Sequence, residues 1–277
     1  MSKSSKSTNQ EQSVIFLHVP KAAGSTLYRI IDRQYKPTAI FAIDGKRVRE
    51  SVDEFKNLPK TQREGIKFLK GHMYFGLHES LPQPSTYITI LRDPVERIIS
   101  HYYYVLRSPD HYLYKKVTSQ NMSLKDYVCS GISTELDNGQ TRLVSGLEQT
   151  VFDCEKCSAN VLELAKMNLR NHFAVVGLSE RFDETLILLQ KAFAYKIPFY
   201  LKKNVTNNRP LKENISQDTV KYIEEYNQLD IELYDYAKTN FENVINQQES
   251  YFKRELEIFK LLNMIYVKTY SFSRRAS

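Results

Sequence analysis

The sequence predicts an α/β fold in a single domain, with a central parallel sheet flanked by helices. The first observation is a set of short apolar, β-branched and aromatic runs, at residues 14–17, 66–69, 87–91 and 173–177. Runs of this kind are typical of strands that are buried on both faces of a sheet. The second observation is that segments with helical spacing of apolar residues lie between these runs. Strands that alternate with helices form parallel sheets.

The other elements are predicted from local signals. Residues 36–58 mix charge with short apolar pieces, which indicates a loop, a short strand and a short helix. Asp93 and Pro94 start a helix, because aspartate caps a first turn and proline is tolerated at its first position. Helical periodicity is present at residues 95–107, 124–129, 141–144, 160–169, 180–193, 216–241 and 252–267.

Composition indicates a folded chain with an anionic partner. The 277 residues suffice for one domain with a full core, and 42% hydrophobic with 26% charged residues is typical of a globular protein. The net charge of +7 fits a nucleotide, an acidic glycan or a nucleic acid. No arginine-rich tract or aromatic-basic repeat is present, so a nucleic-acid partner is not expected.

Residues 1–12 are polar and are expected to form a disordered tail. They lack the apolar stretch of a secretory signal, and no run of eighteen apolar residues occurs, so no transmembrane segment is expected. The predicted organisation is this tail, a domain at residues 13–245 and a helical extension at residues 246–277. A cytoplasmic location is expected.

The cysteines do not predict a metal centre or a disulfide scaffold. Cys154 and Cys157 form a single C-x-x-C pair, and a zinc site would need two further ligands. Only Cys129 and scattered histidines remain. Reduced thiols without a bound metal are therefore expected.

The segment around the first strand predicts an anion site. After residues 14–17 the chain continues as Pro20, Lys21, Ala22, Ala23 and Gly24. Proline ends a strand, and small residues let backbone N–H groups approach a ligand. Ser25 or Thr26 is expected to cap the following helix. This order of elements, a strand, a small-residue loop with a lysine and then a helix N-terminus, suits a phosphate. The alternative interpretation is an ordinary turn between strand and helix with a solvated lysine.

This loop is not the P-loop of NTPases, because Lys21 precedes Gly24-Ser25-Thr26 and no glycine precedes the lysine. Residues 18–27, HVPKAAGSTL, resemble the 5′-phosphosulfate loop of sulfotransferases that use 3′-phosphoadenosine 5′-phosphosulfate (PAPS). The resemblance is closest to the carbohydrate branch with the heparan sulfate 2-O-sulfotransferases. It implies a P-loop-like nucleotide-binding sulfotransferase fold and PAPS as the donor. Golgi relatives carry a membrane anchor, so its absence favours a bacterial, cytoplasmic enzyme or a truncated chain.

A second anchor is predicted at the third strand. In the PAPS-dependent families this strand ends in an arginine, and a serine eight residues later binds the 3′-phosphate with it. Arg92 and Ser100 match that spacing in LRDPVERIIS. The planar guanidinium suits a phosphate, because it donates two parallel hydrogen bonds. The alternative is an ion pair between Arg92 and a carboxylate, with Ser100 packed on its helix.

His72 is the candidate base, because an imidazole can take a hydroxyl proton near neutral pH. It follows the second strand, at the carboxyl edge where ligands bind in such sheets. Gly71-His72 resembles the Gly-His of the 2-O-sulfotransferase branch. Some of those enzymes have a second histidine where Lys70 stands here. Weaker candidates are His18, expected within the strand, His101, expected to pack on its helix, and His78.

Three further segments resemble this branch. Residues 137–142 resemble an element that could face the acceptor, through Asn138 and Arg142. Residues 173–182 resemble the strand, turn and helix beside the adenine. Residues 203–210 resemble a loop that closes over the nucleotide, with Lys203 and Thr206 as contacts to the 3′-phosphate. The resemblance spans residues 14–241 and leaves out the last helix.

The resemblance implies an enzyme that transfers a sulfuryl group from PAPS to a hydroxyl of a carbohydrate-like acceptor, without a metal. Lys21, the N–H groups of residues 22–26 and the hydroxyls of Ser25 and Thr26 would bind the 5′-phosphate that leaves. One alternative is a nucleotide-dependent kinase, for which Mg²⁺ ligands and a Walker-type lysine are not found. Another is a non-catalytic protein that binds adenosine 3′,5′-bisphosphate, which would not need His72.

Overall fold

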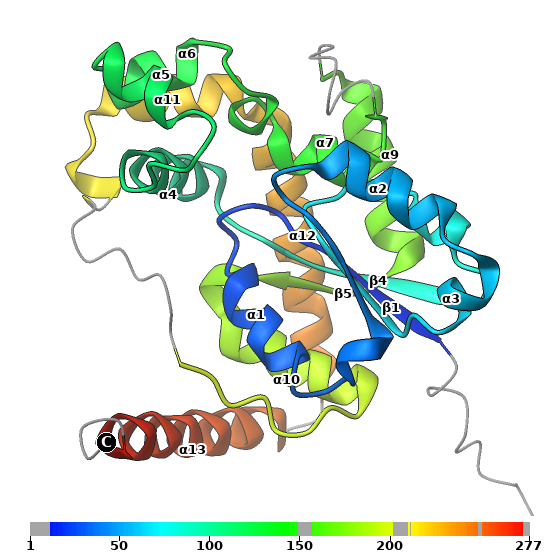
Figure 1. Cartoon of the computed structure of the whole chain (residues 1–277). Coiled ribbons are helices and arrows are strands. Elements are labelled where there is room, and N and C mark those ends of the chain that lie inside the picture. Colours follow the sequence, from blue (N-terminus) through cyan, green and yellow to red (C-terminus); the bar gives the residue numbers. More distant parts are fainter. Residues whose placement is uncertain (1–11, 149–156, 202–209, 211, 249–250, 274–277) are drawn as a thin grey trace, which may run out of the picture.

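The computed structural model describes residues 12–148, 157–201, 210, 212–248 and 251–273. Its centre is a parallel five-stranded sheet in the order β2-β3-β1-β4-β5 (Figure 1). The strands are β1 (Ser13–Leu17), β2 (Ile40–Ile43), β3 (Phe68–Gly71), β4 (Ser85–Leu91) and β5 (Phe173–Leu178). The predicted α/β class, with a central parallel sheet flanked by helices, is confirmed.

Helices cover both faces of the sheet. On one side lie α1 (Gly24–Ile31) and α10 (Phe182–Phe193), and on the other α2 (Val48–Asn57), α7 (Gly139–Ser145) and α9 (Ala159–His172) (Figure 1). The short helix α3 (Lys60–Glu64) precedes β3. Strand β1 is fully buried, and the core around it extends to α12 (Gln228–Asn246) and α13 (Tyr251–Ser273). This layering explains why the strands are continuously apolar.

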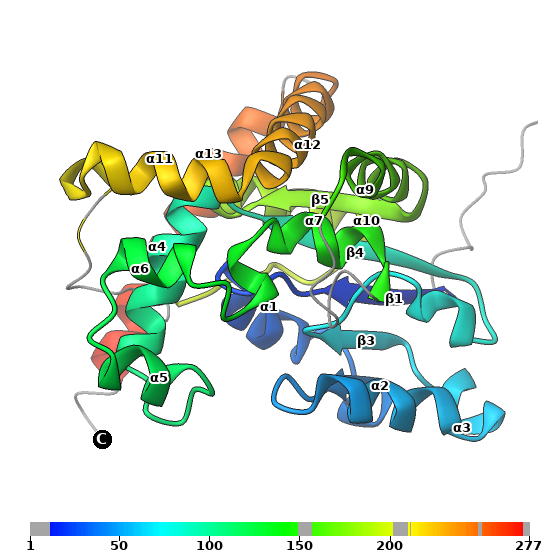
Figure 2. The same ribbon diagram turned by 90° about the horizontal axis from the view of Figure 1, so that it is seen from above.

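A second hydrophobic cluster lies beyond the carboxyl ends of the strands. It joins α4 (Pro94–Leu106), α5 (Tyr114–Ser119), α6 (Leu124–Cys129) and α11 (Gln217–Tyr226). Figure 2 shows these helices together at the end toward which the strand arrows point. The cluster therefore forms a wall next to the edge where parallel sheets bind ligands. Within the described residues, no helix has both the length and the apolar character to cross a bilayer.

Two local predictions about helices are wrong, and one is confirmed. Helix α1 begins at Gly24 after Ala23, whose φ of 63° is left-handed, and neither Ser25 nor Thr26 caps it. Residues 216–241 form two helices and not one, because Asn227 interrupts them and its amide donates to the carbonyls of Leu136 and Ile223. The start of α4 is as predicted, since the Asp93 side chain accepts from the Glu96 N–H.

Asp230 on α12 fixes the helical wall to the sheet. The residue is fully buried, and its carboxylate accepts from the backbone N–H groups of Gln140 and Thr141 and from the Thr141 hydroxyl, at 2.7–3.1 Å. It also pairs with Arg97 of α4 at 3.3 Å, and Arg97 is 1% exposed. A buried pair of this kind is costly to break, because the remaining charge has no water to solvate it.

We expect Asp230→Ala to lower the free energy of unfolding by about 3–5 kcal/mol, because Arg97 would stay buried without its counter-charge. Urea denaturation followed by circular dichroism measures this loss. Asp235→Ala on the exposed face of the same helix is the control, and we expect it to change stability by less than about 0.5 kcal/mol. Equal small losses in the two variants would contradict a structural role for Asp230.

Candidate active site

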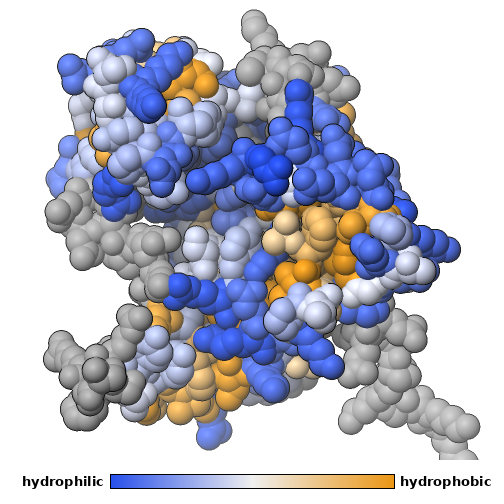
Figure 3. All heavy atoms as spheres, in the orientation of Figure 1, coloured by the Kyte–Doolittle hydropathy of each residue, from blue (hydrophilic) through white to orange (hydrophobic). Residues whose placement is uncertain are grey.

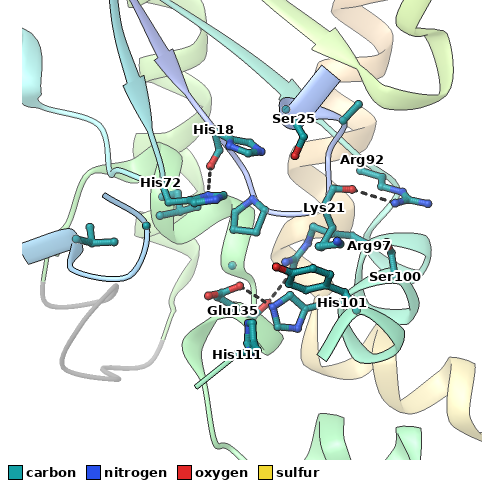
Figure 4. A pocket seen from close by; sticks show the side chains of 18 of the residues that line it. His18, Lys21, Ser25, His72, Arg92, Arg97, Ser100, His101, His111 and Glu135 are labelled. Atoms are coloured by element: carbon teal, nitrogen blue, oxygen red, sulfur yellow. Dashed lines mark hydrogen bonds and ion pairs between the residues drawn. The ribbon is translucent and has the colours of Figure 1, made fainter. Parts of the chain in front are cut away.

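A cleft of about 1690 Å³ lies at the carboxyl edge of the sheet (Figure 4). Residues that follow each of the five strands line it, together with residues from α4 and the turn at residues 133–135. Its volume exceeds the 300–1,000 Å³ or so of an ordinary small-molecule pocket, so it has room for more than one small molecule. Of the residues predicted from the sequence, it contains Lys21, Ala23, Gly24, Ser25, Thr26, His72, Arg92, Ser100 and Arg142.

The loop after β1 turns tightly into α1. Lys21 and Ala23 both have left-handed φ angles, of 68° and 63°, and Ala22 between them is buried and does not line the cleft. The first N–H groups of a helix favour an anion; in α1 the Thr26 N–H donates to the Ala23 carbonyl, so the N–H groups of Gly24 and Ser25 are the candidates for a ligand. Ser25 is exposed and its hydroxyl is directed to the cleft (Figure 4). The loop therefore suits an anion such as a phosphate.

Lys21 is held over the cleft by an aromatic ring. Its Nζ lies 3.8 Å from the ring centroid of Tyr104, which projects from α4. The attraction between an ammonium group and the face of a ring orients the lysine without neutralising its charge. Tyr102 packs in the core of the helical wall instead.

Arg92 connects the ends of β1 and β4. Its Nη1 donates to the carbonyl of Lys21 at 2.9 Å, and its Nη2 to Glu96 at 3.2 Å. Glu180 lies 3.9 Å from its Nε. Ser100, one turn beyond Glu96 on α4, is 8% exposed and lines the same cleft. Arg92 thus forms an ion pair with a carboxylate, as the alternative to a phosphate site predicts. It also lines the cleft beside Lys21.

His72 has one ring nitrogen fixed and the other available. Its Nδ1 lies 3.0 Å from the carbonyl oxygen of His18. A carbonyl only accepts, so Nδ1 carries the hydrogen and the lone pair of the neutral ring is on Nε2. Burial lowers the pKa of His72, although the charge of Glu135 opposes this. The imidazole is therefore neutral, and able to accept a proton, at neutral pH.

His18 lies against His72. The two rings stack with centroids 4.2 Å apart, and the Nδ1 of His18 hydrogen-bonds with the Tyr28 hydroxyl at 2.9 Å. A Cβ on Gly24 would lie 1.9 Å from the Nε2 of His18, so only glycine fits there. The expectation that His18 lies within the strand is wrong: β1 ends at Leu17, and His18 follows it and lines the cleft. His18 thus connects the loop after β1, at Gly24, to the candidate base His72.

The pair His101–Glu135 was not predicted. The Nε2 of His101 lies 2.8 Å from a Glu135 carboxylate oxygen, and both residues line the cleft (Figure 4). Burial raises the pKa of Glu135, but the charge and the hydrogen bond of His101 outweigh it and bring this pKa to about 2. Glu135 lies on the short turn Thr134–Leu136, which carries no sequence motif, so no signal could have indicated it.

The two predicted acceptor residues are placed differently. Arg142 lines the cleft, but it is buried and pairs with Asp137. Asn138 does not line the cleft. Its side-chain oxygen accepts from the N–H groups of Leu229 and Asp230, so it holds the start of α12. Contact with an acceptor thus stays a prediction for Arg142, and the geometry assigns Asn138 to the scaffold.

Some predicted residues lie outside the described part of the chain. These are Lys203, Thr206 and Cys154. Cys157 is described as a free thiol, and burial raises its pKa to about 12. No cluster of three or more His, Cys, Asp or Glu side chains that could hold a metal is present among the described residues. Lys70, in place of a second histidine, pairs with Asp32.

Comparison with known proteins defines the class. A family model described as "Sulfotransferase family" matches residues 7–237, and the chain belongs to this family. Heparan-sulfate 6-O-sulfotransferase 1 of Cricetulus griseus and of Mus musculus are each 30% identical over 203 residues, covering 64% of this chain and 48% and 47% of theirs. The chain spans about half the length of these curated relatives.

The relatives are 6-O-sulfotransferases, so the predicted 2-O branch is not confirmed. The crystal structure of mouse sulfotransferase SULT7A1 complexed with PAP is similar at a TM-score of 0.41 and 11% identity, over 95% of this chain and 90% of that one.

The histidine stack predicts a dependence of stability on pH. Burial, the charge of His72 and that of Lys21 hold the pKa of His18 well below its ordinary value. As the pH falls through about 6.5, His18 therefore becomes protonated in the unfolded chain but stays neutral in the folded chain. Stability is complete above that pH and falls below it by about 1.4 kcal/mol per pH unit for each such histidine.

We expect His18→Gln to reduce this slope, as measured by urea denaturation between about pH 7.5 and pH 5. His172→Gln, which removes an exposed histidine, is the control and should change the slope less than His18→Gln does. An unchanged slope in His18→Gln would mean that His18 is not held neutral by the fold.

Proposed function

We propose that this protein transfers the sulfuryl group of PAPS to a hydroxyl of a carbohydrate. The observation that carries the proposal is the convergence of Lys21, His72 and Arg92 on one cleft, from three adjacent parallel strands. Membership of the sulfotransferase family and the similarity to heparan sulfate sulfotransferases support it.

The nucleotide would lie between two cationic positions. Lys21, the first N–H groups of α1 and the hydroxyls of Ser25 and Thr26 would bind the 5′-phosphosulfate. Arg92 and Ser100 would bind the 3′-phosphate, with Lys203 and Thr206 added from the late loop. The hydrogen bond from Arg92 to the Lys21 carbonyl holds the two positions at a fixed separation.

The reaction needs a base on the side of the sulfur opposite the leaving group. The acceptor oxygen would form a bond to sulfur as the bond between sulfur and the 5′-phosphate oxygen breaks. The Nε2 of His72 would take the hydroxyl proton, and Lys21 would stabilise the charge on the leaving phosphate. The products are a sulfate ester and adenosine 3′,5′-bisphosphate.

The acceptor is proposed to be an acidic glycan. Lys46, Arg47 and Arg49 line the wall of the cleft between β2 and α2 together with the carboxylates of Asp44 and Glu50, which leaves this wall a net charge of +1 even though Arg47 pairs with Asp44. Motif resemblance favours a 2-hydroxyl, whereas the relatives found are 6-O-sulfotransferases. A transfer assay with labelled PAPS on heparan sulfate, followed by disaccharide analysis, distinguishes the two positions.

Adenosine 3′,5′-bisphosphate should bind at least about 30-fold more tightly than ADP, because a charged pair at the 3′-phosphate is worth about 2 kcal/mol or more. Isothermal titration calorimetry measures both constants. Arg92→Ala should reduce the difference by weakening the 3′-phosphorylated ligand more than ADP. Equal affinities in the original protein would remove the case for a 3′-phosphate site.

His72→Ala should lower the transfer rate by about 10²–10⁴-fold, because a general base contributes this much, while the affinity for adenosine 3′,5′-bisphosphate stays within about threefold. His172→Ala is the matched control and should leave both unchanged. Retained turnover in His72→Ala would place the base elsewhere. Tight nucleotide binding without transfer to any glycan, in the original protein, would favour the non-catalytic alternative.

A further inference from the structure

Helix α13 has two apolar faces, and only one of them is covered. Phe252 and Phe259, at 2% and 5% exposure, pack into the core beside α10. The same face is held by an ion pair between Lys191 and Glu255 at 2.8 Å, and by a hydrogen bond from the Tyr200 N–H to Asn263. These contacts fix the orientation of α13 on the domain.

The second face is exposed. Ile258, Leu261, Leu262 and Ile265 are 37–53% exposed, and their spacing of three, one and three residues places them on one face of the helix, which we name the α13 stripe. In Figure 3, apolar atoms reach the surface at the lower edge, where Figure 1 places α13. Of the described residues that line the cleft, none belongs to α13, so the candidate active site does not use this stripe.

We propose that the α13 stripe binds the same stripe of a second copy of this chain, with the two helices antiparallel. The stripe reads the same in both directions, as Ile, Leu, Leu and Ile. A two-fold axis between Leu261 and Leu262 sets Ile258 against Ile265 of the partner subunit. Self-complementarity of this kind is what a two-fold interface requires. Aliphatic seams at such spacing pack knobs into holes.

The charges beside the stripe support the antiparallel arrangement. Glu257 and Lys268 lie on the same side of the stripe and are about three turns apart, so they flank its two ends. The two-fold axis brings Glu257 of one copy near the partner's Lys268, and the same pair recurs at the other end. A parallel pairing would leave Glu257 about three turns along the helix from the partner's Lys268 and would lose both ion pairs, and an anionic lipid surface would repel Glu257.

The test is sedimentation equilibrium of the full chain over a range of concentrations. The original protein should dimerise, and the double variant Leu261→Glu/Leu262→Glu should be monomeric with its affinity for adenosine 3′,5′-bisphosphate unchanged. Met167→Glu is the matched control, because Met167 is 44% exposed and lies on α9, away from the stripe, and this variant should still dimerise. A monomer at every concentration would overturn the proposal.

A charge exchange tests the orientation. Glu257→Lys and Lys268→Glu should each weaken the dimer by about threefold or more at low salt, and the double variant should restore it. Failure of the double variant to recover would overturn the antiparallel pairing. Co-sedimentation with phosphatidylcholine–phosphatidylserine vesicles completes the test. A monomeric chain that binds these vesicles through the stripe would replace the second copy by a lipid surface.

Discussion

The parallel order β3-β1-β4 at the centre of the sheet is the constraint on which the candidate site depends. Strands that run in one direction end at one edge, so the residues that follow them meet there. Lys21, His72 and Arg92 are distant in sequence and each follows one of these strands. None of them needs a long loop to reach the cleft. The sheet thus supplies the rigid positioning that a transfer reaction requires.

The ring of His18 makes the phosphate loop and the candidate base interdependent. The ring packs against Gly24 on one side and stacks on His72 on the other. The backbone carbonyl of His18 fixes the tautomer of His72. Burial keeps this ring neutral, so it adds no positive charge beside the base. A change in the loop after β1 would therefore alter the position of His72 through His18, without a direct contact between the loop and His72.

The cations of the cleft differ in whether a carboxylate lies beside them. Glu96 and Glu180 lie beside Arg92, and Glu135 pairs with His101, while Lys21 is oriented by the ring of Tyr104. An aromatic ring leaves the charge of a lysine available, whereas a carboxylate partly neutralises it. Positive charge is thus concentrated at Lys21 in the loop after β1.

The sequence by itself determined the features of the fold and site that depend only on residues close to one another in the chain. Continuous apolar runs predicted the strands, Asp93 and Pro94 predicted the start of α4, and the loop around Lys21 predicted an anion site. Only the tertiary structure decided the break at Asn227, the pairing of His101 with Glu135, and the placement of Asn138 behind the cleft. These features depend on side chains that meet partners distant in the sequence. Local propensity carries no information about such partners, because packing alone brings them together.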